Sequence, residues 1–346
     1  MISRRSQAIT LILSGAALFF CSLLALSLGA VSTPISDVVH FCVIAISDSL
    51  LSAQQHYPSL YAIVFQIRLP RVVAAIVAGG ALAIAGVCTQ GLFRNPLASP
   101  DILGVSAGSS FGAVVAISFG FALTSPLATP FAAAIGALIC AFFVYLLAKK
   151  SHDGQTLYLI LAGLALSSLL GGMTMGILLF AKQYQLNQFV FWTMGGLEGR
   201  MWQHVLWPLP IILIVAGLAL SKAHWLNLLS LGNEAAHGLG LNVPRARVTL
   251  LMIATLLTAM SIAIAGPIGF IGLMVPHLVR LLFGANHKTL LPISAMFGAI
   301  LLLVCDLAGR YLIAPYEIKA GIIISVVGGL YFVMLIVRVQ QKGRLI

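Results

Sequence analysis

Charged side chains are scarce in this chain of 346 residues: Asp, Glu, Lys and Arg together make up 8% of it. A soluble domain carries about 25%. Hydrophobic residues make up 60%, and the mean hydropathy is +1.08. We therefore expect one membrane domain over residues 1–346 and no soluble domain of ordinary size. The net charge of +11 then reflects basic loops at one membrane face and not nucleic-acid binding.

Carboxylates are especially few, with eight in the whole chain. Ion-coupled transporters usually carry acids or broken-helix ion sites within their spans, and Asp306 is the acid that we expect inside one. It lies one helical turn before Arg310, so an ion pair between the two is the simplest interpretation. The shortage of acids counts against ion-coupled secondary transport, which stays as an alternative.

The residues for two further chemistries are also missing. No GxxxxGK[ST] sequence is present, so the chain does not hydrolyse ATP by a phosphate-binding loop. The five cysteines lie mostly in apolar runs without metal-ligand spacing, and we interpret them as small core residues. We expect this chain to hold no catalytic residue, no metal and no cofactor.

Long apolar runs are abundant, and at about 20 residues per helix they predict an all-α protein with about ten transmembrane helices. With the N-terminus in the cytoplasm, most of the 19 Lys and Arg residues fall in cytoplasmic loops, which predicts that both termini are cytoplasmic. The first external loop, Val31–Tyr61, has no Lys or Arg. The predicted spans are 8–30, 66–92, 101–120, 130–148, 156–180, 201–221, 247–265, 268–282, 290–309 and 320–338.

The segment 225–243, WLNLLSLGNEAAHGLGLNV, lies between two of these runs. Its Asn, Glu and His side chains are too polar for the bilayer, yet leucines recur through it. This composition predicts one or two short helices that lie against another protein at the cytoplasmic membrane surface.

Three arginines, Arg68, Arg71 and Arg310, fall at the external ends of predicted spans. Such residues commonly extend along the membrane interface to reach water. Basic side chains gathered on the external face also suit an acidic partner protein, and both interpretations stay open at this point.

Small residues recur after an internal turn bounded by proline. Gly104, Gly108 and Gly112 are spaced by four, which favours close helix packing and is compatible with a place beside a pore. Asp101 precedes them and is a candidate cap for the helix that follows.

Several longer strings resemble the FecCD family of ABC importer permeases, in order from Arg68 to Arg338. They are the RLPR motif, GGALAIAGVCTQGLFRNPLASPDILGVSAGSSFGA (Gly79–Ala113), LGNEAAHGLG (Leu231–Gly240), GPIGFIGLMVPHLVRLLFGANHKTLLP (Gly266–Pro292), and the D-x-x-x-R of Asp306 and Arg310.

The resemblance implies a BtuC-like fold of about ten helices in the bacterial inner membrane, within membrane lipid. It implies two ATPase subunits that hold ATP and Mg, and a second permease chain. It also implies a periplasmic or lipid-anchored binding protein that delivers a ferric siderophore, haem or cobalamin.

Carried over by position, the resemblance assigns three sets of residues. Binding-protein docking falls on Arg68, Arg71 and Arg310. ATPase coupling falls on Leu231, Gly232, Glu234, Ala236, His237, Leu239 and Gly240. The translocation path falls near Gly104, Gly108, Gly112, Met175 and Leu179.

The C-terminal strings APYEIKAG (Ala314–Gly321) and VGGLYFVMLIV (Val327–Val337) look most like one subunit of ferric-enterobactin permeases, as does GGLEGRMW (Gly195–Trp202). This favours a catecholate siderophore and a second permease of different sequence, with haem or cobalamin as the alternative. The chain departs from the family pattern at Lys319, an extra cation beside Glu317. It also departs at His237-Gly238, where glycine weakens a helix by about 1 kcal/mol relative to alanine.

Overall fold

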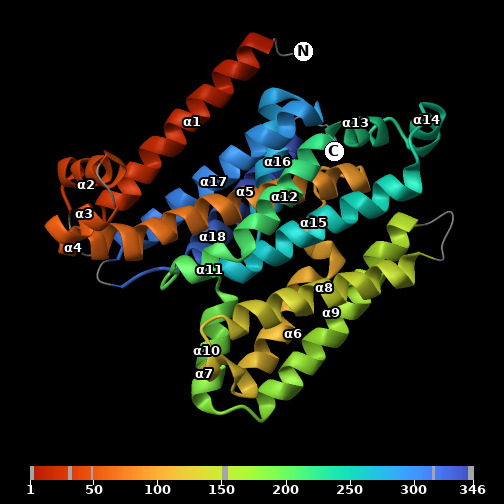
Figure 1. Cartoon of the computed structure of the whole chain (residues 1–346). Coiled ribbons are helices and arrows are strands. Elements are labelled where there is room, and N and C mark those ends of the chain that lie inside the picture. Colours follow the sequence, from red (N-terminus) through yellow and green to blue (C-terminus); the bar gives the residue numbers. More distant parts are fainter. Residues whose placement is uncertain (1–3, 30–32, 48–49, 150–154, 314–315, 342–346) are drawn as a thin grey trace.

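The computed structural model describes residues 4–29, 33–47, 50–149, 155–313 and 316–341, and helices make up nearly all of them (Figure 1). The helices that match the predicted spans are α1 (Arg4–Ser27), α5 (Leu69–Phe93), α6 (Val105–Ser118), α8 (Ala128–Ala148), α9 (Gln155–Leu179), α12 (Pro208–Ser221), α15 (Val243–Ala265), α16 (Ile271–Phe283), α17 (His287–Tyr311) and α18 (Ala320–Gln341).

Shorter elements connect these helices. They are α2 (Ile35–Ser47), α3 (Leu50–His56), α4 (Pro58–Leu60), a π-helical segment (Tyr61–Arg68), a 3-10 turn (Pro100–Leu103), α7 (Phe121–Thr124), α10 (Gln183–Thr193), α11 (Trp202–Leu206), α13 (Ala223–Leu229) and α14 (Asn233–Gly238).

Eight helices in the described part of the chain are long and apolar enough to cross a membrane. Two further apolar helices, α6 with 14 residues and α16 with 13, also match predicted spans but are shorter than a bilayer is thick. Each of the ten predicted spans corresponds to a helix, and the prediction of an all-α polytopic membrane protein is confirmed.

Helix α5 is the centre of the bundle and is almost wholly buried. It packs against α15, α16 and α17, and its contact with α17 is the most extensive in the chain. A Cβ added at Gly79 would collide with the carbonyl oxygen of Gly298 in α17, and one added at Gly86 would collide with the carbonyl oxygen of Gly272 in α16. Small residues thus let the backbones meet directly, as membrane helices require in the absence of a hydrophobic driving force.

A second layer, formed by α6, α8 and α9, lies below the first in Figure 1. Helices α6 and α8 also meet through small residues: Gly108 of α6 contacts Gly136 of α8, and Gly112 contacts Ala132. Helix α15 contacts both α5 and α8 and so joins the two layers.

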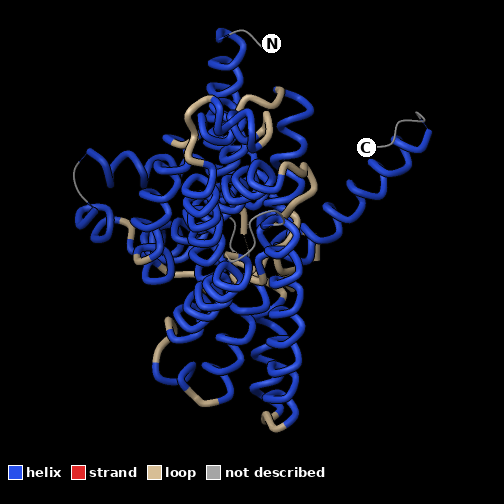
Figure 2. Tube along the Cα trace, turned by 90° about the vertical axis from the view of Figure 1, so that its right-hand side faces the viewer, coloured by secondary structure: helices blue, strands red, loops and turns tan. Residues whose placement is uncertain are grey.

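Three long helices, α1, α9 and α18, bury little of their surface within the chain. Figure 2 shows the C-terminal part of α18 standing clear of the bundle. Apolar side chains are as stable against lipid tails as against other apolar side chains. These faces can therefore contact either lipid or another subunit.

The two ends of the bundle differ in structure. Helices α13 and α14 lie at one end, which we call the α14 end; α2, α3, α4, α7, α10 and α11 lie at the other, the Arg71 end (Figure 1). Within Val31–Tyr61, predicted as an external connection between spans, the described residues form α2, α3 and α4, and the run VVHFCVIAI lies in α2. The span predicted at 66–92 begins earlier, since the helical path runs unbroken from Pro58 to Phe93.

The α5–α17 contact makes a test of the bundle's core. We expect Gly298→Val to destabilise the chain by about 1–3 kcal/mol or more, because the added atoms meet the α5 backbone, which cannot move aside. The measurement is the thermal unfolding midpoint of the purified chain in detergent. Gly217→Val in α12 is the matched control, since nothing lies within 4 Å of a Cβ at that position. Equal midpoints for the two variants would contradict the role given to this contact.

Candidate functional site

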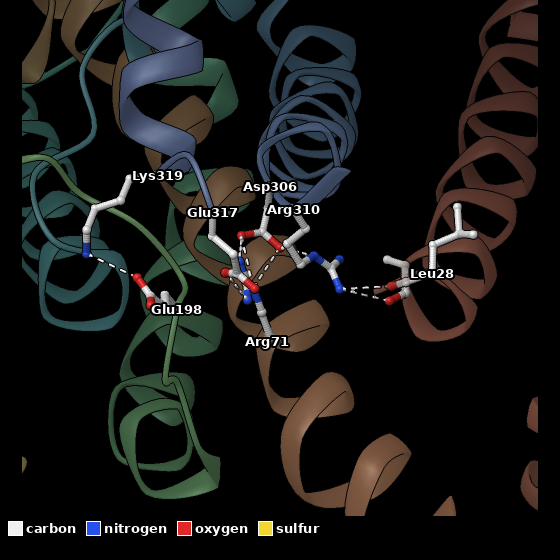
Figure 3. A network of polar contacts seen from close by, with 8 residues as sticks. Leu28, Arg71, Glu198, Asp306, Arg310, Glu317 and Lys319 are labelled. Carbon is white, nitrogen blue, oxygen red and sulfur yellow. Dashed lines mark hydrogen bonds and ion pairs between the residues drawn. The ribbon is translucent and has the colours of Figure 1, made fainter. Parts of the chain in front are cut away.

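A cluster of ion pairs joins three elements at the Arg71 end (Figure 3). The Arg71 guanidinium donates to both carboxylate oxygens of Asp306, with Nε 2.9 Å from Oδ2 and Nη2 3.0 Å from Oδ1. Its Nη1 donates to Glu317 Oε2 at 2.9 Å. Asp306 is only 2% exposed. A forked, charge-assisted pair of this kind fixes the relative orientation of its two side chains and also stabilises their contact. The cluster therefore holds α5, α17 and the segment before α18 together.

Arg310 and Arg68 hold the C-terminal end of α1. Arg310 forms a 3.3 Å ion pair with Asp306, and its Nη1 donates to the Leu28 carbonyl. Arg68 Nη1 donates to the carbonyls of Leu26 and Ser27 at 2.6 and 2.8 Å. The last carbonyls of a helix lack partners within it and carry partial negative charge. Two arginines from other helices therefore supply hydrogen-bond donors to the last carbonyls of α1 and fix this end of α1 to the bundle.

These contacts bear on the predicted docking arginines. The structure brings all three together at one end, but Arg68 and Arg310 are buried and each makes bonds within the chain. They do not form an exposed basic patch. The predicted ion pair between Asp306 and Arg310 is confirmed. The docking of another protein stays a prediction, and the exposed carboxylate of the cluster belongs to Glu317.

A second set of charges lies nearby on the 194–201 loop. Lys319 Nζ is 3.6 Å from Glu198 Oε2, so the extra cation pairs with Glu198 and not with its sequence neighbour Glu317 (Figure 3). Arg200 in the same loop is partly buried, and burial lowers its pKa to about 10, which leaves it charged at neutral pH. The loop is fixed by the Gly196 amide, which donates to the Ala265 carbonyl at 2.7 Å.

The predicted surface segment forms two short helices, as expected. Helix α13 buries Ala223, Leu226 and Leu229 against the bundle. Helix α14 projects further and buries only Ala236. Leu231 and Leu239, on either side of it, are both 62% exposed. Gly238 is the last residue of α14, so the unusual glycine ends the helix and does not interrupt it.

Polar side chains tie this segment to the bundle. Asn227 in α13 bonds His287 and Asn286 at the start of α17. Arg247 of α15 donates to Asn233 at the start of α14, with 3.2 Å between Nη2 and Oδ1. Asn227 and Asn233 are too polar for the bilayer, but their partners are not evident from the sequence, because those lie 14 to 60 residues away.

The predicted path residues do not share one surface. Gly104, Gly108 and Gly112 lie at the contacts of α6 with α8 and α9. This agrees with the interpretation that they serve close helix packing. Met175 and Leu179 of α9 are exposed, Leu179 by 78%. Their place beside a path stays a prediction.

The capping role offered for Asp101 is wrong. Gly104 is the N-cap of α6, with φ +70°, and Asp101 accepts a hydrogen bond from the Ser106 hydroxyl instead.

The described residues contain no group of three His, Cys, Asp or Glu side chains arranged to hold a metal ion. The bundle carries exposed leucines beside α14 at one end and the ion pairs of Asp306 at the other.

Comparison with known proteins gives the family. The model of the FecCD transport family matches residues 17–338, so the chain belongs to that family. It is the transmembrane permease subunit of an ABC transporter and has no catalytic role of its own.

The chain is 42% identical over 288 residues to the hemin transport system permease protein HmuU of Yersinia pestis, covering 82% of this chain and 86% of that protein. It is 37% identical over 332 residues to the Fe(3+) dicitrate transport system permease protein FecD of Escherichia coli, covering 96% and 98%. A solved structure of a metal-chelate type ABC transporter in an inward-facing conformation matches with a TM-score of 0.82 at 32% identity, covering 95% and 98%.

Removing the central acid of the charge cluster tests its structural role. We expect Asp306→Asn to destabilise the chain by about 3–5 kcal/mol, because Arg71 and Arg310 then lack their shared buried counter-ion. Glu198→Gln is the control and should cost about 0–1 kcal/mol, since its ion pair is exposed. Thermal unfolding of both purified variants measures the difference. A loss at Asp306 no larger than at Glu198 would show that the cluster is not what holds this end together.

Proposed function

We propose that this chain is the permease subunit of an ATP-driven importer that moves a ferric siderophore, of the catecholate type, across the inner membrane into the cytoplasm. The segment 225–243 with α13 and α14, which we call the α14 segment, carries the proposal, because it presents the exposed Leu231 and Leu239 on a chain of the FecCD transport family. The substrate class rests on the resemblance of the C-terminal strings to ferric-enterobactin permeases. One relative is named for hemin and another for Fe(3+) dicitrate. Haem therefore stays an alternative substrate to the siderophore, and so does cobalamin.

The α14 end is then the cytoplasmic end, where ATP is available to two partner ATPase subunits that bind it with Mg. Leu231 and Leu239 supply exposed apolar anchors, and Glu234 and His237 supply polar contacts around them. Apolar anchors surrounded by polar groups are the usual anatomy of a protein interface. Both chain termini lie on the same cytoplasmic side in this assignment.

The Arg71 end is then the external end, where the binding protein docks. Glu317, with Arg71 behind it, and the exposed Glu198 with Lys319 are charges there that a partner could reach. Arg68 and Arg310 act there by holding α1 in place. A partner that meets alternating charges of this kind gains specificity and a faster encounter more than affinity.

The second permease is proposed to face α9 and α18, so that the path runs between the two chains beside Met175 and Leu179. Both helices leave most of their apolar surface unburied within this chain. Movement of the α14 segment by the ATPase subunits would shift this bundle between outward-open and inward-open states.

The ATPase contact can be tested by charge reversal at the tip. We expect the tagged wild-type chain, purified in detergent from its native host, to bring an ATPase and a distinct second permease with it. Glu234→Arg combined with Leu239→Asp should abolish ATPase association and leave folding intact, because both side chains are exposed.

The matched control is Glu198→Arg combined with Leu123→Asp, an exposed pair at the other end, which should leave the ATPase bound. ATPase association that survives the change at α14 would refute the coupling assignment. A wild-type chain that purifies alone and still transports in response to an ion gradient would favour secondary transport instead.

The substrate can be identified by growth. In a host stripped of its own importers, the complete transport system should support growth with ferric enterobactin as the sole iron source. Growth with haem alone, or a rescue limited to cobalamin supply, would replace the siderophore by one of the two alternatives and leave the permease assignment unchanged.

A further inference from the structure

We propose that Asn227 is the positioning residue through which movement of the α14 segment reaches α17 and, by α17, the charge cluster at the Arg71 end. This inference rests on the proposed function, since it takes the α14 segment as the part that an ATPase moves.

Asn227 joins α13 to the first turn of α17 by directional bonds. Its Oδ1 accepts from the His287 backbone amide at 2.9 Å and lies 2.8 Å from His287 Nδ1. Its Nδ2 donates to Asn286 Oδ1 at 3.1 Å, and that oxygen also accepts from the Lys288 amide as the cap of α17. The first amides of a helix need partners from outside the helix. A residue of α13 therefore helps to complete the end of α17.

The neighbouring contacts of the segment go elsewhere. Leu226, the residue before Asn227, is fully buried and packs against Gly91 of α5. The Asn233–Arg247 bond leads from α14 to α15. Helix α13 also packs directly on α17. Hydrogen bonds weaken steeply when their angle or length changes, so the bonds at Asn227 tie the first turn of α17 to the position of α13.

Helix α17 is built to carry such a displacement. Asp306 and Arg310 lie 19 and 23 residues after His287, so at 1.5 Å per residue the helix carries about 29 to 35 Å between the Asn227 contact and the ion pairs. Asp306 then meets Arg71 of α5, which meets Glu317 before α18. Pro292 near the start of α17 removes one backbone hydrogen bond there but does not end the helix, which runs on to Tyr311. A small shift of a helix is a common element of changes carried between distant sites. The first residue of α17 thus contacts the segment that faces the ATPase, and the last turns of the same helix carry Asp306 and Arg310.

The test uses the whole assembly, with its ATPase subunits and second permease, in lipid nanodiscs. Hydrogen–deuterium exchange is measured with and without ATP and Mg, so no transported substrate is needed. In the wild type we expect ATP to change exchange both in α14 and in the last turns of α17. In Asn227→Ala we expect the change in α14 to remain and the change at the Arg71 end to be lost.

Asn95→Ala is the matched control, because it removes one exposed bond, to the Leu97 amide, within its own turn at the same membrane face. It should behave as the wild type does. An Asn227→Ala assembly that still carries the change to the Arg71 end, or that loses its ATPase subunits, overturns the inference while the proposed function stands. A wild-type chain with no ATPase partner overturns both.

Discussion

Direct contact between helix backbones is the constraint on which the rest of this structure depends. Gly79 with Gly298 and Gly86 with Gly272 bring α5 against α17 and α16 so closely that no side chain fits between them. Packing of that kind resists continuous deformation, because close-packed interiors transmit strain and do not absorb it. Helices held this way move as units. The bundle can therefore connect events at its two ends although it contains few polar groups.

The charge cluster and the α14 segment depend on that frame. Asp306 is buried at the end of α17, where it faces Arg71 only because α5 and α17 run side by side. Two positive side chains around one buried carboxylate would be costly alone, but Arg310 also bonds carbonyls of α1 and Glu317 adds a second acid. At the other end, α13 lies flat because Leu226 and Leu229 are buried, which leaves the tip at Leu231 and Leu239 free.

Much of the fold followed from the sequence because a bilayer leaves few choices. Runs of about 20 apolar residues can satisfy their backbone in a bilayer only as helices, so each of the ten predicted ranges contains a helix, although α6 and α16 are shorter than a bilayer is thick. The surface segment was recognisable too, since its asparagines could not lie in lipid. The short helices α2, α3 and α4 within Val31–Tyr61 were not predicted, because the absence of basic residues does not separate a short apolar helix from an irregular connection.

The sequence by itself determined the all-helical membrane class, the places of the long helices and the family, because these depend on composition, periodicity and strings read in order. Tertiary structure alone decided what each charged residue does. Arg68, Arg71 and Arg310 are equivalent in sequence as basic residues near helix ends, yet one bonds α1, one bonds two carboxylates and one bonds both groups. The Asp306–Arg310 pair is four residues apart and followed from the local spacing, but the other partners lie 41 to 285 residues away along the chain. Those distant partners are fixed by how the helices pack, which no local pattern records.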